Sequence, residues 1–211
     1  MLMAAIKFVR SRETSKLPAE DVTARFAGRL PSFIAKVAEY KPEIIVAPGS
    51  SGRIVAYFLR KHLGIKKVFF LSRAFKRRGR ELTEMLPGGN PLLEKAANGK
   101  RVLVVDDFAI SGASGAKVAD YLRRMSPASV GFMSMTHYRH GREEALSLLS
   151  KKYRDVDLGE GMENWNDSLR GHSPGPMVKN SKGEVEILRT DNYRIFLKKV
   201  EALLEESRGK K

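Results

Sequence analysis

Cysteine is absent from this chain of 211 residues, and tryptophan occurs only once. Without cysteine the chain has neither a disulfide framework nor a thiolate metal site, so nothing in it calls for an oxidising compartment. No apolar run approaches the roughly 18 residues that a membrane-spanning helix needs. The apolar start, Met1–Ile6, is too short for the core of a signal peptide and is followed at once by charged residues. We therefore expect a cytoplasmic protein without membrane contact.

Acidic residues are few relative to basic ones. The chain has 39 Lys and Arg against 24 Asp and Glu, which gives a formal net charge of +15. Such an excess favours polyanionic partners, either nucleic acid or a small ligand that carries several phosphates. A generally basic surface explains the same excess, so net charge alone leaves both interpretations open. The hydrophobic fraction of 42% is typical of a globular protein.

Short apolar runs alternate with amphipathic stretches after residue 40. Strands that are apolar at every position are buried on both faces of a sheet, and repeated strand–helix–strand units make that sheet parallel. We predict an α/β fold with a doubly wound, mostly parallel sheet, in a single domain over residues 1–211. The expected strands are Glu43–Ala47, Lys67–Ser72, Arg101–Asp106 and Val130–Thr136, and the expected helices are Ser51–Leu63, Ser114–Met125 and Arg142–Lys152.

The two ends of the chain have a different pattern. Residues 18–40 predict a helix that Pro31 kinks or splits. Residues 159–180 are rich in Gly, Pro, Asn and Ser, which is typical of a long loop. An alternating edge strand over 184–188 and a closing amphipathic helix over 193–206 are expected to follow.

The most informative segment is residues 101–115. An apolar strand leads into Asp106 and Asp107, and the small residues Ser111–Ser114 then open a helix. Backbone N–H groups at a helix N-terminus hold phosphate well, and Gly112 permits the tight turn that this needs. Carboxylates at the carboxyl end of a strand lie where open α/β sheets bind ligands, and a pair of them suits ribose hydroxyls and a hard cation such as Mg²⁺.

Two other classes share part of this pattern. Nucleotide hydrolases have a similar acidic strand, but the chain contains no Gly-x-x-x-x-Gly-Lys-[Ser/Thr] loop. Response-regulator receivers begin with a similar strand, yet the region of their phosphoacceptor, Asp155 and Asp157 here, lacks the expected apolar strand. Neither class accounts for the phosphate loop that follows the acids.

The run Asp-Asp-x-x-x-[Ser/Thr]-Gly-x-[Ser/Thr] resembles the signature by which type I phosphoribosyltransferases bind 5-phosphoribosyl-1-pyrophosphate (PRPP). It is matched by Asp106, Asp107, Ser111, Gly112 and Ser114, and the resemblance extends over roughly residues 43–136. It implies a Mg²⁺-dependent transfer of the phosphoribosyl group to a nitrogenous base with release of pyrophosphate, and it implies a homodimer. It also implies a core over about 41–158 and a small hood from about 1–40 and 159–211.

The same resemblance assigns roles to further residues. In the family a small-residue loop after the first strand binds pyrophosphate, and a mobile basic loop after the second strand closes over the substrate. The resemblance makes Asp106, Asp107 and Arg73 catalytic and assigns Asp106 and Asp107 to the metal. The expected PRPP-binding residues are Ser50, Ser51, Gly52, Arg73, Lys76, Asp106, Asp107, Ile110, Ser111, Gly112, Ala113 and Ser114.

The acceptor base stays open in the sequence. Members that act on 6-oxopurines carry an acid just before the phosphate loop, where this chain has Ile110. An alternative function is a PRPP-sensing regulator that binds nucleic acid without transferase activity. His137 and His140 have a spacing that a metal could use, but without a third ligand we expect them to be surface or loop residues.

Overall fold

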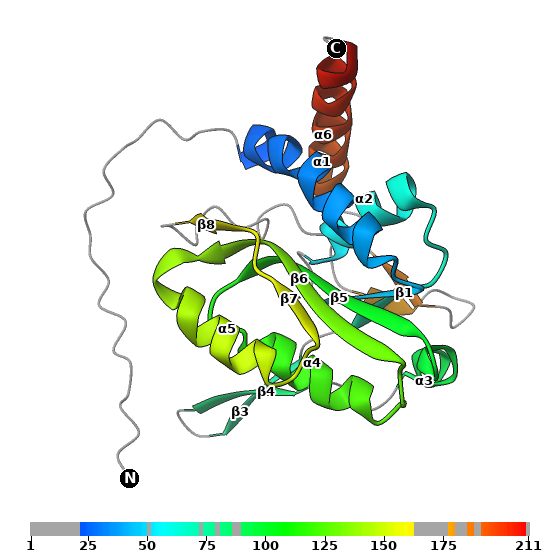
Figure 1. Cartoon of the computed structure of the whole chain (residues 1–211). Coiled ribbons are helices and arrows are strands. Elements are labelled where there is room, and N and C mark those ends of the chain that lie inside the picture. The colour runs from blue at the N-terminus through cyan, green and yellow to red at the C-terminus, as the bar shows by residue number, and fades with distance from the viewer. Residues whose placement is uncertain are drawn as a thin grey trace.

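The computed structural model describes residues 22–49, 52–71, 74–78, 81–85, 90–162, 177–179, 185–187 and 191–209. Its centre is a six-stranded sheet in which every pairing between strands is parallel (Figure 1). The strand order is β2-β1-β5-β6-β7, and β8 also pairs with β6. The strands are β1 (Ile44–Pro48), β2 (Val68–Leu71), β5 (Arg101–Ala109), β6 (Ser129–Tyr138), β7 (Asp155–Asp157) and β8 (Glu160–Met162).

Helices cover both faces of this sheet (Figure 1). One face carries α1 (Val22–Tyr40), α2 (Gly52–Leu63) and α6 (Asp191–Gly209), and the other carries α3 (Pro91–Ala97), α4 (Ala113–Arg123) and α5 (Arg142–Ser150). Successive residues of β5 alternate between the two cores: Leu103 and Val105 join the first, whereas Val102 and Val104 join the second. All four are fully buried, which confirms the predicted doubly wound α/β fold.

Two antiparallel pairs complete the described strands. The first is β3 (Ala74–Arg78) with β4 (Glu81–Met85), and the second is β9 (Met177–Lys179) with β10 (Val185–Ile187). The expected mobile loop after the second strand therefore contains a strand, and the expected long loop over 159–180 contains β8 and β9. The prediction of a loop over 159–180 was wrong at these strands because it rested on composition, while pairing with a neighbour decides whether a short segment is a strand. The mobility of the segment after β2 stays a prediction.

The helix α3 was not expected from the sequence. It has seven residues, and its N-terminus carries Pro91 at its first position and Asn90 as the cap. The Asn90 side chain accepts a hydrogen bond from the backbone N–H of Leu93 at 3.1 Å. In contrast, Pro31 lies inside α1 and does not split that helix.

The two helices nearest the chain ends pack on each other and on α2. The ring of Phe26 in α1 lies 5.7 Å from Phe58 in α2 and 5.5 Å from Phe196 in α6, measured between centroids. All three side chains are buried. This aromatic cluster fixes α1 and α6 over one face of the sheet. No helix among the described residues is long and apolar enough to cross a membrane.

Candidate functional site

The sheet has one point at which the strand order reverses. From β1 the chain crosses to β2 on one side, and it later returns to β5 on the other side of β1. Connections after β1 and β5 therefore leave the carboxyl ends of the two strands in opposite directions, which opens a crevice where α/β proteins bind ligands. Val46 of β1 pairs with Val104 of β5. Two residues further along each strand, Pro48 at the end of β1 therefore lies level with Asp106.

Asp106 and Asp107 lie at this crevice and are buried, with 6% and 5% of their surfaces exposed. They are inside β5, which continues to Ala109, so the expected strand end at Asp106 was wrong. The backbone N–H of Asp107 donates to Asp106 Oδ1 at 3.0 Å, and Thr136 Oγ1 of β6 donates to the Asp107 carbonyl at 2.8 Å. Carboxylate oxygens are ligands that a hard cation such as Mg²⁺ prefers.

The N-terminus of α2 lies against the first of these acids. A Cβ on Gly52 would lie 3.1 Å from the Val105 carbonyl oxygen and 3.2 Å from Asp106 Oδ1. A side chain here would force its neighbours to shift by a few tenths of an ångström, so glycine suits the close start of α2, and the positive end of the helix dipole faces the carboxylate. Gly52 was expected in the pyrophosphate loop. Its companions Ser50 and Ser51 lie outside the described residues.

The loop that follows β5 leads into α4 through Gly112. This residue has a φ of +72° and caps the helix, and a Cβ on it would lie 2.9 Å from Cγ of Leu149 in α5. The first-turn amides of α4 have no partner within the helix, as in any helix, and the first turn contains no acidic residue. Ile110 and Ala113 are exposed, while Ser111 and Ser114 are half-buried. The predicted phosphate loop thus has the backbone conformation and charge that suit an anion.

The remaining expected residues lie partly outside the described structure. Arg73 is not among the described residues, and for Lys76 only its backbone place in β3 is described. The structure brings Gly52, the two aspartates and the loop over residues 110–114 to one edge of the sheet. The roles assigned to these residues stay predictions.

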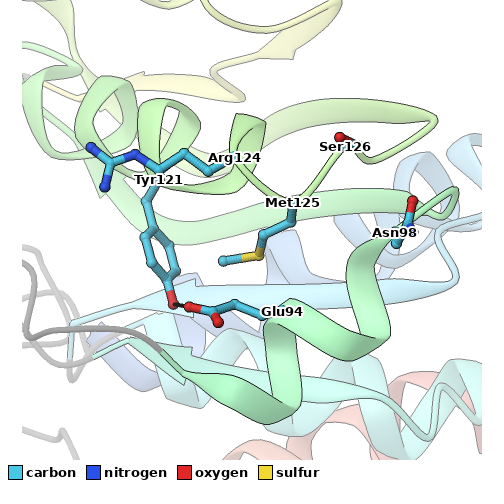
Figure 2. Close-up of a pocket in the computed structure, with 6 residues that line it drawn as sticks. All are labelled: Glu94, Asn98, Tyr121, Arg124, Met125 and Ser126. Atoms are coloured by element: carbon cyan, nitrogen blue, oxygen red, sulfur yellow. Dashed lines mark hydrogen bonds between the residues drawn. The ribbon is translucent and has the colours of Figure 1, made fainter.

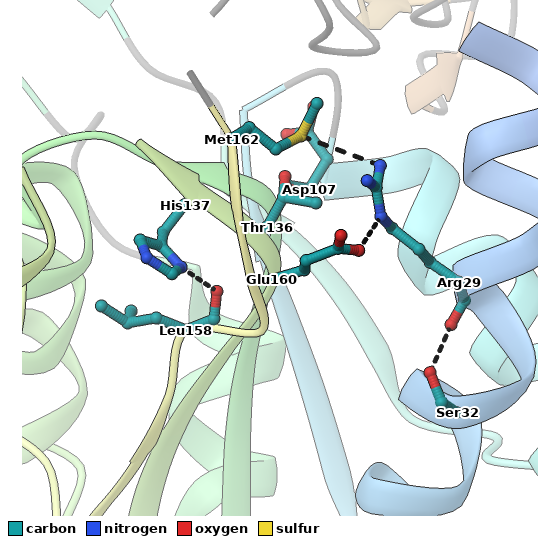
Figure 3. A network of polar contacts seen from close by, with 8 residues as sticks. All are labelled: Arg29, Ser32, Asp107, Thr136, His137, Leu158, Glu160 and Met162. Carbon is teal, nitrogen blue, oxygen red and sulfur yellow. Dashed lines mark hydrogen bonds and ion pairs between the residues drawn. The ribbon is translucent and has the colours of Figure 1, made fainter. Parts of the chain in front are cut away.

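A polar network on the α1 side of Asp107 was not predictable from any sequence pattern (Figure 3). Arg29 Nε of α1 donates to Glu160 Oε2 of β8 at 2.5 Å, and Arg29 Nη1 lies 3.8 Å from the sulfur of Met162. In Figure 3 Met162 and Thr136 lie beside Asp107, with Arg29 reaching toward them from α1. The hydrogen bond from Arg29 holds the pKa of Glu160 below its usual value.

Arg53 was also missed as part of the site. It follows Gly52 in the first turn of α2, is buried, and lies over the ring of Phe70 at 5.8 Å from the centroid. Burial lowers the pKa of its guanidinium. Arginine is rarely buried, so a sequence pattern alone does not indicate such a position.

The expectation for His137 was wrong. Its side chain is buried in β6, and its Nδ1 lies 3.1 Å from the Leu158 carbonyl oxygen, because the β7–β8 connection covers this part of the strand. His140 is exposed, as expected. Among the described residues, no group of three or more His, Cys, Asp or Glu could hold a metal ion.

Fold and site together define an open, parallel α/β protein. An acidic pair and a loop suited to phosphate lie at the point where its strand order reverses, which we call the switch point. The profile of the phosphoribosyl transferase domain family matches residues 21–159, which is most of the chain. The chain therefore belongs to this family, and it is an enzyme of the phosphoribosyltransferase type.

Solved phosphoribosyltransferase structures resemble the chain to different degrees, and the first of the following three supports the fold. The xanthine-guanine-hypoxanthine phosphoribosyltransferase of Helicobacter pylori is 20% identical, with a TM-score of 0.51 over 65% of this chain and 84% of that one. The purine phosphoribosyltransferase of Pyrococcus horikoshii is 18% identical (TM-score 0.49, 65% and 83% covered). The orotate phosphoribosyltransferase of Aeropyrum pernix is 21% identical (TM-score 0.44, 70% and 77% covered). A search of curated proteins gave no match.

Proposed function

We propose that the chain transfers the 5-phosphoribosyl group of PRPP to a nitrogen of a purine or pyrimidine base, with release of pyrophosphate and with Mg²⁺ bound. One observation carries the proposal: a buried pair of adjacent carboxylates lies at the switch point, between the N-terminus of α2 and the loop that opens α4. A ligand with a polyol centre and phosphates at both ends fits this arrangement.

Asp106 and Asp107 would hold the ribose hydroxyls and the metal. Their hard oxygen atoms suit Mg²⁺, which binds through one or two carboxylates and completes its shell with water and substrate phosphate oxygens. When bound, Mg²⁺ supplies positive charge that stabilises the departing pyrophosphate. Because β5 alternates, the two side chains start on opposite faces of the sheet, so each can serve a different part of the ligand.

The phosphates of PRPP would bind at the two helix starts. Residues 110–114 would hold the 5′-phosphate at the N-terminus of α4, and Ser50, Ser51 and Gly52 would hold the pyrophosphate at the start of α2. Arg73 and Lys76 would close over the pyrophosphate. Breaking the bond at C1 of the ribose needs positioning, charge stabilisation and exclusion of water, and these groups provide all three without a covalent intermediate.

The acceptor would lie on the α1 side of Asp107. Ile110, with 47% of its surface exposed, stands where family members specific for 6-oxopurines carry an acid, so no carboxylate is supplied at that position. The hood, which we place at about residues 1–40 and 159–211, would choose among bases. We also propose a homodimer and a cytoplasmic location, in line with the family resemblance.

The test is pyrophosphate release from PRPP with Mg²⁺ across a panel of purines, pyrimidines and amines. We expect release with one class of acceptor, reduced by about 10²-fold or more in Asp106→Asn and in Asp107→Asn. Asp155→Asn, which changes an exposed aspartate at the start of β7, should keep wild-type activity. PRPP should also raise the melting temperature of the wild type, because it binds the folded chain.

No release with any acceptor would overturn the proposed transfer. If PRPP still raised the melting temperature, the alternative of a PRPP-sensing regulator would take its place. Equal activity in both aspartate variants and the wild type would remove the acid pair from the mechanism.

A further inference from the structure

The edge of the sheet opposite the candidate site is strongly basic. It is built from the segments that lead into β1, β2, β5, β6 and β7, namely residues 39–43, 64–68, 98–101, 123–128 and 150–155, which we call the basic edge. These segments contain ten Lys and Arg but only three acids, Glu39, Glu43 and Asp155. The ten cations are Lys41, Lys66, Lys67, Lys100, Arg101, Arg123, Arg124, Lys151, Lys152 and Arg154.

Backbone hydrogen bonds join these segments into one row. The N–H of Ile45 donates to the Lys67 carbonyl and that of Glu43 to Arg101, both at 3.0 Å. The row continues through two more backbone bonds. The N–H of Ala128 donates to the Lys100 carbonyl at 3.0 Å, and the N–H of Arg154 donates to the Val130 carbonyl at 3.1 Å. Since neighbouring strands lie about 4.8 Å apart, five of them make a row roughly 20 Å long.

Most of these cations are available to a partner. Ion pairs join Lys100 to Glu43 at 3.0 Å, and Lys152 and Arg123 to Asp120 at 2.6 and 3.9 Å. The other seven are exposed, and no ion pair links them to any residue within the ranges that the structure describes. So many charges of one sign in a short row repel one another unless a polyanion lies along them.

The opposite edge lacks this excess where β5, β6 and β7 end. The described segments after these strands, residues 109–113, 138–143 and 157–162, contain Arg139 and Arg142 against Glu143, Asp157 and Glu160. After β2, in contrast, the chain continues into β3, whose sequence carries Lys76, Arg77 and Arg78. Within the described part of the chain the basic edge lies away from the acidic pair.

A pocket of about 570 Å³ opens beside the row, between α3 and α4 (Figure 2). It is lined by Glu94, Asn98, Tyr121, Arg124, Met125 and Ser126. Figure 2 shows the Tyr121 ring reaching from α4 toward Glu94, with the Met125 side chain next to it. The ring of Tyr121 can stack on a nucleobase and the exposed amide of Asn98 can hydrogen-bond it, whereas Met125 is buried, with 7% of its surface exposed.

We infer that the basic edge binds single-stranded nucleic acid, with phosphates along the row and one base in the pocket beside Tyr121. A single strand fits because only an unpaired base can enter a pocket. An anionic membrane fits less well, since surface insertion needs exposed apolar side chains. The large exposed hydrophobic residues among those described are Leu92, Ile110 and Ile195, and none belongs to the basic edge.

The test uses the full chain and a labelled single-stranded RNA of about 20 nucleotides, followed by fluorescence anisotropy between about 50 and 300 mM KCl. The triple variant Arg101→Gln/Arg124→Gln/Arg154→Gln should bind at least about ten-fold more weakly, with a salt slope smaller by about 2. The matched control, Arg194→Gln/Lys198→Gln/Lys199→Gln, removes as many exposed cations from α6 and should bind like the wild type. An equal loss in both triple variants would overturn the inference.

Further measurements test the pocket, the kind of partner and the independence from pyrophosphate release. Tyr121→Leu should weaken RNA binding about ten-fold without changing the salt slope, because a stacked base contributes roughly 1–3 kcal/mol. Binding that is equally tight to the same sequence as a duplex, or seen only with phosphatidylserine vesicles, would contradict the proposal. Pyrophosphate release should be unchanged in the basic-edge triple variant, so that failure of the proposed transfer and failure of this inference remain distinct results.

Discussion

At the scale of single residues, two glycines determine how closely the backbone approaches the candidate site. Gly52 allows α2 to begin against Asp106, and Gly112 allows the loop after β5 to turn into α4. The second position was predictable, because the motif itself calls for a tight turn. The family resemblance also named Gly52, but its close approach to Asp106 was not predictable, since it depends on how α2 packs against β5, and that contact joins residues more than 50 positions apart.

Replacement of Gly112 by alanine should be more harmful than a comparable change elsewhere. Gly112→Ala combines a left-handed φ of +72° with a clash at 2.9 Å from Leu149, whereas Gly99→Ala has a φ of +66° and nothing within 4 Å. We expect Gly99→Ala to lower the free energy of unfolding by about 1 kcal/mol, and Gly112→Ala by about 1–3 kcal/mol more. Chemical denaturation of both variants measures the difference. Equal losses would show that the loop relaxes around the added methyl group.

At the scale of elements, the terminal helices are tied to the sheet by aromatic packing. Phe196 of α6 is 1% exposed and touches the Phe26 ring, while its neighbour Ile195 is 52% exposed. Phe196→Ala should therefore lower the free energy of unfolding by about 3–5 kcal/mol. The matched change Ile195→Ala should stay within about 0.5 kcal/mol. Thermal melting checks both, and similar melting temperatures would mean that α6 contributes little to the fold.

The pair formed by Arg29 and Glu160 should make the contact between α1 and β8 sensitive to acid. Arg29 holds the Glu160 pKa below its usual value, so this contribution to stability is present above about pH 4.3 and is lost as the pH falls through the lower folded pKa. Glu160→Gln should be less stable than the wild type at pH 7 by under about 1 kcal/mol, because the pair is exposed. The difference should be smaller near pH 3.

Urea denaturation at both pH values measures this effect. Glu144→Gln, which changes an exposed glutamate on α5, is the control and should show no difference from the wild type at either pH. A difference for Glu160→Gln that persisted at low pH would assign the effect to packing and not to charge.

The elements that the sequence predicted are those with a strong pattern of their own. The apolar runs at β1, β2, β5 and β6 were placed to within a few residues, and so were α2, α4 and α5. The missed elements are short: α3 has seven residues, and β7 and β8 have three each. Such segments have too few residues to show a hydrophobic period, and they are stabilised by partners that are distant in sequence. The burial of His137 was missed for the same reason, because it depends on the distant connection to β8 that covers it.

At the scale of the whole molecule, all strands of the sheet run in the same direction, so the segments that precede them and the segments that follow them lie at opposite edges with different chemistry. The composition predicted a polyanionic partner but not where the charge lies, because ten cations from five separate segments meet only through the strand order. The acids and the phosphate loop were predictable because they are adjacent in sequence. The pocket between α3 and α4 was not, since it needs a helix that the pattern did not show.

The extension of β5 beyond the acidic pair has a consequence for local unfolding. Asp106 and Asp107 lie in the interior of a strand that pairs with β6 as far as Ala109, in register with His137. Fraying at a strand end therefore does not reach them, and exposing them requires breaking the centre of the sheet. Backbone amides there open with free energies close to that of global unfolding. We therefore expect the backbone that carries the two carboxylates to stay in place when the loops around it move.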